Sequence, residues 1–257
     1  MTFLALDIGN TSTNAALFRN GRLIAHGRLP TNRLSHRAEP WLLAFLKGNS
    51  ADTSELDGLG IASAVPSATE TCRRFCRDRL HHPPFVITGG THTRLVNRCR
   101  PARSLGPDRL VAALAASHFY RPPLICASFG TATVVDAVSA DFEFLGGAII
   151  PGVRLFTEAL SAHTALLPHI EPTEAASPIG DNTVSALRAG AIFGSAGALE
   201  GLVRHFRMRL GRQARLVITG GYAALVMPHL RGRFFHRPHL ALEGIWLAWC
   251  DAGEKKR

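Results

Sequence analysis

Short apolar segments separated by turn residues fill the first half of the chain and predict a mixture of strands and helices. Two of the first strands are joined by Asn20-Gly21, a pair typical of a tight hairpin turn. A helix is expected to begin after Gly106-Pro107, because proline is well tolerated in the first turn of a helix. The other expected elements are strands over 2–8, 15–19, 22–29, 59–66 and 84–90, helices over 36–48 and 69–80, and a loop over 96–104.

The pattern starts again after Pro122-Pro123. Each half opens with a strand, a turn containing glycine and threonine, and two further strands. This shared order predicts an α/β protein of two related domains with a cleft between them, residues 1–118 and 119–257, with the last helix a candidate to pack back on the first domain. The expected elements of the second half are strands over 124–131, 132–140, 142–150 and 215–221, and helices over 153–167, 182–210 and 240–250.

The amino-acid composition indicates which class of protein the chain belongs to. Of the 257 residues, 46% are hydrophobic and 19% are charged, which is ordinary for a globular protein. No apolar stretch approaches the roughly 20 residues that cross a membrane. The N-terminal stretch has no basic region and reads as a strand, not a signal peptide. Five scattered cysteines fit free thiols in a reducing compartment, so a cytoplasmic location is expected.

A net charge of +10 raises the question of a nucleic-acid partner. The basic residues are dispersed along the chain and are nearly all arginine, and no helix-turn-helix, zinc-finger or RNA-binding pattern accompanies them. Cys72 and Cys76 lie one helical turn apart, but no second pair follows at zinc-finger spacing. Nucleic-acid binding and a structural zinc site are therefore disfavoured.

The first candidate site follows the first strand, in Asp7-Ile8-Gly9-Asn10-Thr11. Gly9 lets the backbone approach a phosphate, the Asn10 and Thr11 side chains donate hydrogen bonds to phosphate oxygens, and Asp7 suits a hydrated Mg²⁺. A capped turn between two strands, with no ligand, explains the same residues equally well.

A matching turn, Ser128-Phe129-Gly130-Thr131-Ala132, opens the second half, with Asp136 one strand later. Two such turns would clamp a polyphosphate, although a simple turn is again the alternative. Asp108, in Gly106-Pro107-Asp108-Arg109, is either a helix N-terminal charge or a general base beside an anion-binding Arg109. Thr219-Gly220-Gly221 would let a nucleoside lie against the backbone, but this triplet is weak evidence, because Thr88-Gly89-Gly90 repeats it.

Motifs of other enzyme classes are missing from the sequence. There is no Walker A motif, no GxGxxG after the first strand and no GxSxG. P-loop, Rossmann and serine-hydrolase interpretations are therefore disfavoured.

Taken in order, these motifs closely resemble those of type III pantothenate kinases over nearly the whole chain. The motifs are 7–11, 106–109, 130–132 with Asp136, 146–152, 179–183 and 219–221. The resemblance implies the two-domain actin-like ATPase fold, related to ribonuclease H, with nucleotide in the cleft. It also implies a homodimer and the ATP-dependent phosphorylation of pantothenate, the first step towards coenzyme A.

The resemblance also implies roles for individual residues. Asp108 would be the catalytic base and Asp7 would serve the metal and the phosphates. The residues implied to bind ATP or its phosphates are Asp7, Gly9, Asn10, Thr11, Gly130, Thr131, Ala132 and Gly220. Those implied to bind pantothenate are Gly106, Arg109 and Cys99, with His163, Thr164 and Thr183 reaching into the partner's site. Mg²⁺ and a monovalent cation, K⁺ or NH₄⁺, are implied as well.

Two positions depart from the family pattern. Ser128 stands where an aspartate associated with the monovalent cation is usual, so cation dependence is expected to be altered. Cys99 lies near the position of a tyrosine that lines the pantothenate pocket in many members.

The alternatives are a family member that binds nucleotide but has lost efficient turnover and acts as a regulatory protein, or an actin-like kinase for a sugar or short acid. Ser128 and the basic surface favour the first alternative, and the intact Asp7 and Asp108 count against it. The GPDR and GGAIIPG segments count against the second.

Overall fold

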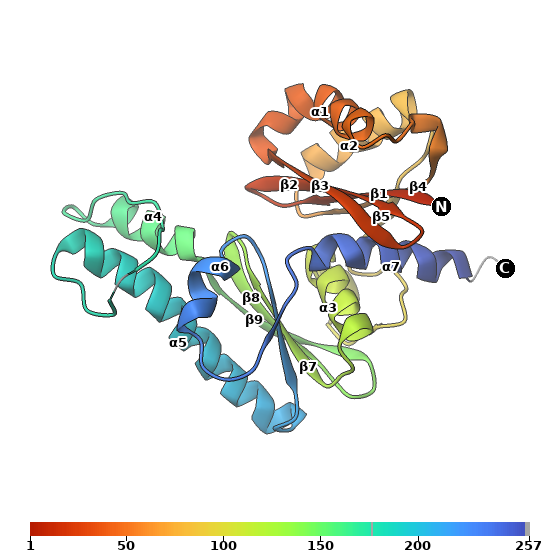
Figure 1. The fold of residues 1–257 in the computed structure, drawn as a ribbon. Helices are drawn as coiled ribbons and strands as arrows, with labels where there is room; N and C mark the ends of the chain where they lie inside the picture. The colour runs from red at the N-terminus through yellow and green to blue at the C-terminus, as the bar shows by residue number, and fades with distance from the viewer. Residues whose placement is uncertain (176, 255–257) are drawn as a thin grey trace. The chain divides into compact units, whose positions relative to one another are not determined.

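The computed structural model describes residues 1–175 and 177–254. The chain forms two compact units, and each is described here by itself (Figure 1). The first unit contains Met1–Phe119 together with the last helix, and the second contains Tyr120–His239. Among the described residues, none of the helices combines the length and the apolar character needed to span a lipid bilayer.

The first unit is built on a sheet with the strand order β3-β2-β1-β4-β5. Strands β1, β2 and β3 form an antiparallel meander, whereas β4 and β5 run parallel to β1. The strands are β1 (Thr2–Ile8), β2 (Ser12–Arg19), β3 (Arg22–Pro30), β4 (Leu56–Ser63) and β5 (Phe85–Ile87), with a short β6 (Val96–Asn97) later in the chain. The helices are α1 (Leu34–Gly48), α2 (Pro66–Arg79), α3 (Pro107–Phe119) and α7 (Leu240–Glu254).

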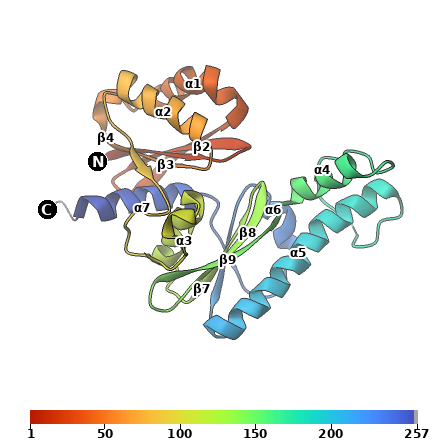
Figure 2. The same ribbon diagram turned by 180° about the vertical axis from the view of Figure 1, so that it is seen from behind.

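Alternation along β1 assigns its side chains to two different layers. Leu4, Leu6 and Ile8 belong to the core that the sheet forms with α1 and α2. Phe3 points to the opposite face, where it contacts Trp246 and Trp249 of α7. In Figures 1 and 2, α1 and α2 lie together on one side of this sheet and α3 and α7 on the other.

Helices α3 and α7 approach each other very closely. A Cβ atom on Gly244 of α7 would lie 1.9 Å from the backbone oxygen of Val111 in α3, so only glycine fits there. On the sheet side of α7, Trp249 and Ile245 occupy the space that side chains at Gly58 and Gly60 of β4 would need. Backbone contact therefore determines how closely α3 packs on α7, and side chains of α7 fill the space between α7 and β4.

The second unit has a sheet in which β11, β10, β7, β8 and β9 follow one another. Strands β7, β8 and β9 repeat the antiparallel meander, and β10 runs parallel to β7. Ile125, Ala127 and Phe129 of β7 pack into a core with the long helix α5. The elements are β7 (Leu124–Phe129), β8 (Ala132–Val138), β9 (Glu143–Pro151), β10 (Arg215–Thr219), β11 (Phe235–His236), α4 (Val153–His163), α5 (Thr183–Leu210) and α6 (Ala223–Val226).

The α/β class is confirmed, and the differences from the expected elements have local causes. The strand expected over 59–66 ends at Ser63, because Pro66 begins α2 and proline suits a first helical turn. Strand β2 begins at Ser12 instead of residue 15, since its polar first residues pair with the end of β1. The helix expected over 153–167 ends at His163, and the short α6 and β11 were not expected.

Candidate active site

The turn after β1 is held from both sides by hydrogen bonds. The backbone N–H of Gly9 donates to the carbonyl of Ser12 at 3.0 Å. The hydroxyl of Thr31 donates to the carbonyl of Gly9 at 2.7 Å, and the N–H of Thr31 donates to the carbonyl of Thr11 at 3.0 Å. Asn10 and Thr11 are exposed at the tip. The turn thus presents short polar side chains on a rigid backbone, which suits an anionic ligand.

Asp7 lies on the face of β1 that also carries Phe3, the side of the sheet on which α3 and α7 lie. Asn14, its partner in β2, donates from Nδ2 to the carboxylate at 3.4 Å. The pKa of Asp7 is raised from its ordinary 3.8 to about 7, mainly by burial and also by the charge of Asp108, while the Asn14 hydrogen bond acts to lower it. The two carboxylates are therefore near enough to repel each other.

Asp108 occupies the first turn of α3, two residues after Gly106. A Cβ atom on Gly106 would lie 2.5 Å from Oδ1 of Asp108, so glycine lets the carboxylate fold back over the start of its own helix. The N–H of Leu110 donates to the carbonyl of Gly106 at 3.1 Å. Arg109, the next residue, is half-buried. The segment therefore presents an acceptor and a cation side by side.

A pair of neighbouring carboxylates is suited to two kinds of chemistry. Two like charges favour a bound cation, and Mg²⁺ uses one or two carboxylates and completes its shell with water and phosphate oxygens. The described residues contain no cluster of three or more His, Cys, Asp or Glu side chains that could hold a metal ion alone. Asp7 and Asp108 thus fit a metal that arrives with a phosphate ligand. A carboxylate is also able to accept a proton from a hydroxyl.

In the second unit, the turn between β7 and β8 is also closed by a hydrogen bond from a glycine N–H, although it spans two residues instead of three. The N–H of Gly130 donates to the carbonyl of Ala132 at 3.1 Å, as Gly9 does to Ser12. Gly152 packs against this turn so closely that a Cβ would lie 2.3 Å from the oxygen of Thr131.

The glycine after β10 lies against the same turn. Gly220 has a φ of +99°, and a Cβ there would lie 2.4 Å from the oxygen and 2.5 Å from the nitrogen of Phe129. The N–H of Tyr222 donates to the carbonyl of Phe129 at 3.0 Å. The Thr219-Gly220-Gly221 and Gly130-Thr131-Ala132 motifs are therefore brought together within one unit.

Ser128 and Asp136 share one face of the second sheet, in neighbouring registers. Asp136 pairs with Cys126, and Ser128 is two residues further along β7. Asp136 is 3% exposed, and together with burial it raises the pKa of Cys126. Ser128 and Asp136 are therefore diagonal neighbours on this face, a relation that usually places residues roughly 7–8 Å apart.

An apolar groove of about 480 Å³ separates α4 from the start of α5. Thr183, the first residue of α5, lies on its wall beside Asn182, whose side chain caps the helix by accepting from the N–H of Ser185 at 3.0 Å. His163 and Thr164 are exposed at the end of α4. Large apolar side chains around the groove are exposed, among them Leu155, Phe156, Leu166 and Ile179.

Comparison with known proteins identifies the family of the chain that carries these features. The model of the type III pantothenate kinase family matches residues 3–205. The chain belongs to this family. A type III pantothenate kinase from Moorella thermoacetica is 36% identical over 250 residues, covering 96% of this chain and 98% of that protein. The corresponding protein from Roseiflexus sp. is also 36% identical, covering 96% and 97%. The protein is thus a kinase, that is, a phosphotransferase.

Solved structures confirm the fold of actin-like ATPases and sugar kinases. The activator of 2-hydroxyisocaproyl-CoA dehydratase from Clostridium difficile, with bound ADPNP, aligns with a TM-score of 0.62 at 12% identity, covering 100% of this chain and 97% of that one. A Baf family transcriptional activator described as putative, from Campylobacter jejuni, aligns with a TM-score of 0.60 at 14% identity, covering 98% and 99%. At these identities the likeness concerns the fold alone.

Several residues of this family member's site escaped the sequence reasoning. Thr31 holds the first turn from the far end of a third strand and carries no motif of its own. Gly152 ends the 146–152 motif, but its close contact with the second turn was not expected. Asn97 holds the segment around Cys99, whose N–H donates to Asn97 Oδ1 at 2.8 Å. The only sequence signal was a polar residue that follows an apolar pair.

Proposed function

We propose that this family member transfers the γ-phosphoryl group of ATP to the hydroxyl group of pantothenate, the first step of coenzyme A biosynthesis. The observation that carries the proposal is the pair of carboxylates, Asp7 at the end of β1 and Asp108 at the start of α3, in a chain of this family. The relatives from Moorella and Roseiflexus are named type III pantothenate kinases, and this chain aligns with nearly the whole length of each.

Within this proposal Asp108 is the general base. Its carboxylate accepts the proton of the pantothenate hydroxyl as that oxygen attacks the γ-phosphorus, and the leaving group is ADP. Arg109 faces the pantothenate carboxylate, and Gly106 and Cys99 line the same substrate. Mg²⁺, held by Asp7 through water, would neutralise phosphate charge when bound.

The two turns are the proposed phosphate clamps, each from its own unit, which we take to be the two domains of the protein. Gly9, Asn10 and Thr11 supply one, and Gly130, Thr131 and Ala132 supply the other. Gly220 offers bare backbone to the nucleoside. In the first turn the N–H of Gly9 donates to a carbonyl three residues later, and in the second turn the N–H of Gly130 donates to a carbonyl two residues later. This similarity between the two turns supports a shared role.

Ser128 is the proposed site of altered cation dependence. A serine hydroxyl keeps one oxygen ligand for K⁺ or NH₄⁺ but lacks the charge of the usual aspartate. Ser128→Asp is expected to tighten the activation constant for K⁺ by about 10- to 100-fold, which corresponds to roughly 1–3 kcal/mol for a charged contact. Titration of activity with KCl at constant ionic strength measures this change, and an unaltered constant would remove Ser128 from the cation site.

The proposed partner is a second copy of the chain. Exposed Leu166 and Ile179 beside the α4–α5 groove supply the apolar surface that a homodimer covers. His163, Thr164 and Thr183 would then reach the pantothenate site of the partner. A cytoplasmic location is proposed as well, because none of the five cysteines, all within the described residues, forms a disulfide.

ADP release from purified protein with ATP, Mg²⁺ and pantothenate tests the proposal, with and without K⁺ or NH₄⁺. We expect pantothenate-dependent turnover that Asp108→Asn lowers by about 10²–10⁴-fold, the usual contribution of a general base. Asp78→Asn, a matched change of an exposed carboxylate in α2, is expected to leave the rate unchanged. ATP binding without turnover under any cation would instead favour a nucleotide-binding regulatory protein, for which Ser128 is the specific observation.

A further inference from the structure

The side chain of Asn97 makes three hydrogen bonds around the segment between β6 and α3. Its Nδ2 donates to the carbonyl of Gly89 at 2.9 Å and to the carbonyl of Ala102 at 2.8 Å. Its Oδ1 accepts from the N–H of Cys99 at 2.8 Å. One amide thus uses both donor hydrogens and its acceptor to join three backbone positions, two of them in the segment that leads to Gly106.

Gly89 forms the other half of this contact. A Cβ atom on Gly89 would lie 2.2 Å from the oxygen of Leu105 and 2.9 Å from the oxygen of Ala102, so any side chain there would displace the segment. The neighbouring Gly90 has nothing nearer than the hydroxyl of Thr88 at 3.9 Å. The first Thr-Gly-Gly triplet of the sequence is therefore a packing surface for the residues just before α3.

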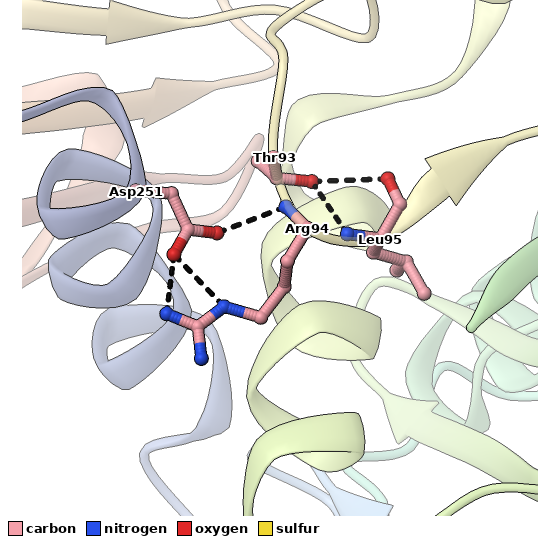
Figure 3. A network of polar contacts seen from close by, with 4 residues as sticks. All are labelled: Thr93, Arg94, Leu95 and Asp251. Atoms are coloured by element: carbon pink, nitrogen blue, oxygen red, sulfur yellow. Dashed lines mark hydrogen bonds and ion pairs between the residues drawn. The ribbon is translucent and has the colours of Figure 1, made fainter. Parts of the chain in front are cut away.

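The chain before Asn97 is fastened separately, as Figure 3 shows. The N–H of Arg94 donates to Asp251 of α7 at 3.0 Å, and its Nε donates to the same carboxylate at 2.8 Å. The hydroxyl of Thr93 donates to the carbonyl of Leu95 at 3.1 Å and accepts from its N–H at 3.2 Å. Since α7 packs against α3, both ends of the segment are tied to the helix that carries Asp108.

We propose that Asn97 is a positioning residue, which together with Gly89 holds residues 98–105 so that Gly106, Asp108 and Arg109 meet the substrate. The inference rests on the proposed function for the role of Asp108. Ala102, whose carbonyl Asn97 binds, begins the short turn Ala102–Ser104, which ends two residues before Gly106. A displacement there is passed directly to the first turn of α3, and a shift of about 1 Å at a catalytic group lowers rates by about 10²-fold.

Two pairs of variants test this role. Gly89→Ala adds one methyl group against the segment, whereas Gly90→Ala adds the same methyl group next to it without contact. Asn97→Ala removes the bracing amide, whereas Asn49→Ala removes an amide that donates to the carbonyl of Phe45 at 2.7 Å at the end of α1. Each member of a pair makes the same chemical change within the first unit.

Gly89→Ala and Asn97→Ala are expected to lower kcat at least tenfold, with the KM for ATP changed less than twofold. Gly90→Ala and Asn49→Ala are expected to stay within twofold of the unaltered protein in both constants. Asn97→Asp, which keeps the size and the acceptor but has no donor, should be as slow as Asn97→Ala. Asn97→Gln, which keeps the donors, should recover part of the rate. If Asn97 and Gly89 had a purely structural role, the variants would lower the unfolding midpoint without lowering kcat selectively over the KM for ATP.

Hydrogen exchange separates failure of this inference from failure of the proposed function. The N–H of Leu105, which donates to the carbonyl of Ala102, is expected to exchange faster in Asn97→Asp and Gly89→Ala than in their controls, whether or not the protein turns over pantothenate. The N–H of Cys99 is expected to exchange faster in Asn97→Ala, which lacks its acceptor. Full kcat in folded Gly89→Ala and Asn97→Asp, or unchanged exchange in both, overturns the inference. Absence of pantothenate-dependent turnover in the unaltered protein, with faster exchange in the variants, refutes the proposed function and leaves the bracing of the segment established.

Discussion

At the scale of single residues, Asp7 combines a structural cost with its proposed use. Its carboxylate is partly buried at the end of β1 and faces the charge of Asp108, and Asn14 supplies one long hydrogen bond in compensation. Both unfavourable effects concern the charged form, so they raise the pKa. A cation placed between the two carboxylates would reverse the balance. The repulsion between the two carboxylates in the free protein thus favours a bound cation, the role proposed for Mg²⁺.

This arrangement predicts how stability depends on pH. With a pKa of about 7, folded Asp7 holds a proton between about pH 4 and pH 7 that the unfolded chain has released. The native state therefore binds more protons, and its free energy of unfolding falls as the pH rises through this window. Asp7→Asn removes the fall, so it is expected to be more stable than the unaltered protein at pH 8, by at most about 4 kcal/mol, and equally stable near pH 4.

Urea unfolding at intervals from pH 4 to pH 8, without nucleotide or Mg²⁺, measures the effect. Asp108→Asn removes the neighbouring charge, so it should lower the pKa of Asp7 and make the free energy of unfolding fall less steeply as the pH rises. Asp78→Asn, on the surface of α2, should leave this pH dependence of stability unchanged. An Asp7→Asn protein with an unaltered pH slope would contradict the assigned environment of this carboxylate.

At the scale of elements, glycine positions connect the strands of the second unit to its turn. Gly220 follows β10 with a φ of +99° and lies on the backbone of Phe129, and Gly152 follows β9 and lies on Thr131. Both remove the side chain at a point of backbone contact. The turn between β7 and β8 is therefore shaped by residues from two other strand ends.

Gly220→Ala is predicted to deform this turn. The new Cβ would lie within 2.4–2.6 Å of backbone atoms of Phe129, and alanine also disfavours the positive φ. Gly232→Ala is the matched control, because Gly232 has a φ of +90° but nothing within 4 Å of an added Cβ. Both variants should lose about 1 kcal/mol of stability from the backbone conformation.

Only Gly220→Ala should weaken ATP binding, by tenfold or more, as measured by calorimetry. Equal affinities in the two variants would show that the contact with Phe129 has no part in the nucleotide site. The comparison is independent of turnover, since it measures binding alone.

The elements also show how far the sequence could lead. Periodicity located β1, α3, α5 and α7, because each is long or strongly patterned and bounded by proline, glycine or a capping residue. It extended β4 to Pro66, since apolar residues continue past the last paired position. Motifs located both turns. Periodicity carries no information on contacts such as Gly89 with Leu105, because they depend on which backbone atoms meet in three dimensions.

At the scale of the whole molecule, apolar side chains are exposed on α4 and on the chain before α5, and such a surface is typical of a protein–protein interface. Leu166 is 90% exposed and Ile179 is 83% exposed, beside a groove lined by Phe156 and Leu160. Thr183 lies on that same groove. The family resemblance implies that, in such a dimer, Thr183 of one copy reaches the site that holds Asp108 of the other. The proposed dimer then shares each active site between two chains.

Sharing predicts complementation between two inactive variants. Asp108→Asn and Thr183→Val are each expected to lower pantothenate-dependent turnover at least tenfold as homodimers. In a mixed dimer one site receives both altered residues and the other receives neither. When the variants are co-expressed in equal amounts, half of the dimers are mixed and about a quarter of all sites are intact, so about a quarter of the full activity should return.

Two controls make this result specific. Leu166→Glu in both chains places charge on the apolar surface and should abolish the recovery, with a monomer in sedimentation. Met208→Glu, at the other end of α5 and 73% exposed, should leave both recovery and dimer intact. If each chain used its own Thr183, every site in a mixed dimer would carry one defect. Turnover would then stay at the level of the parent variants, and the shared site would be refuted even though the dimer persisted.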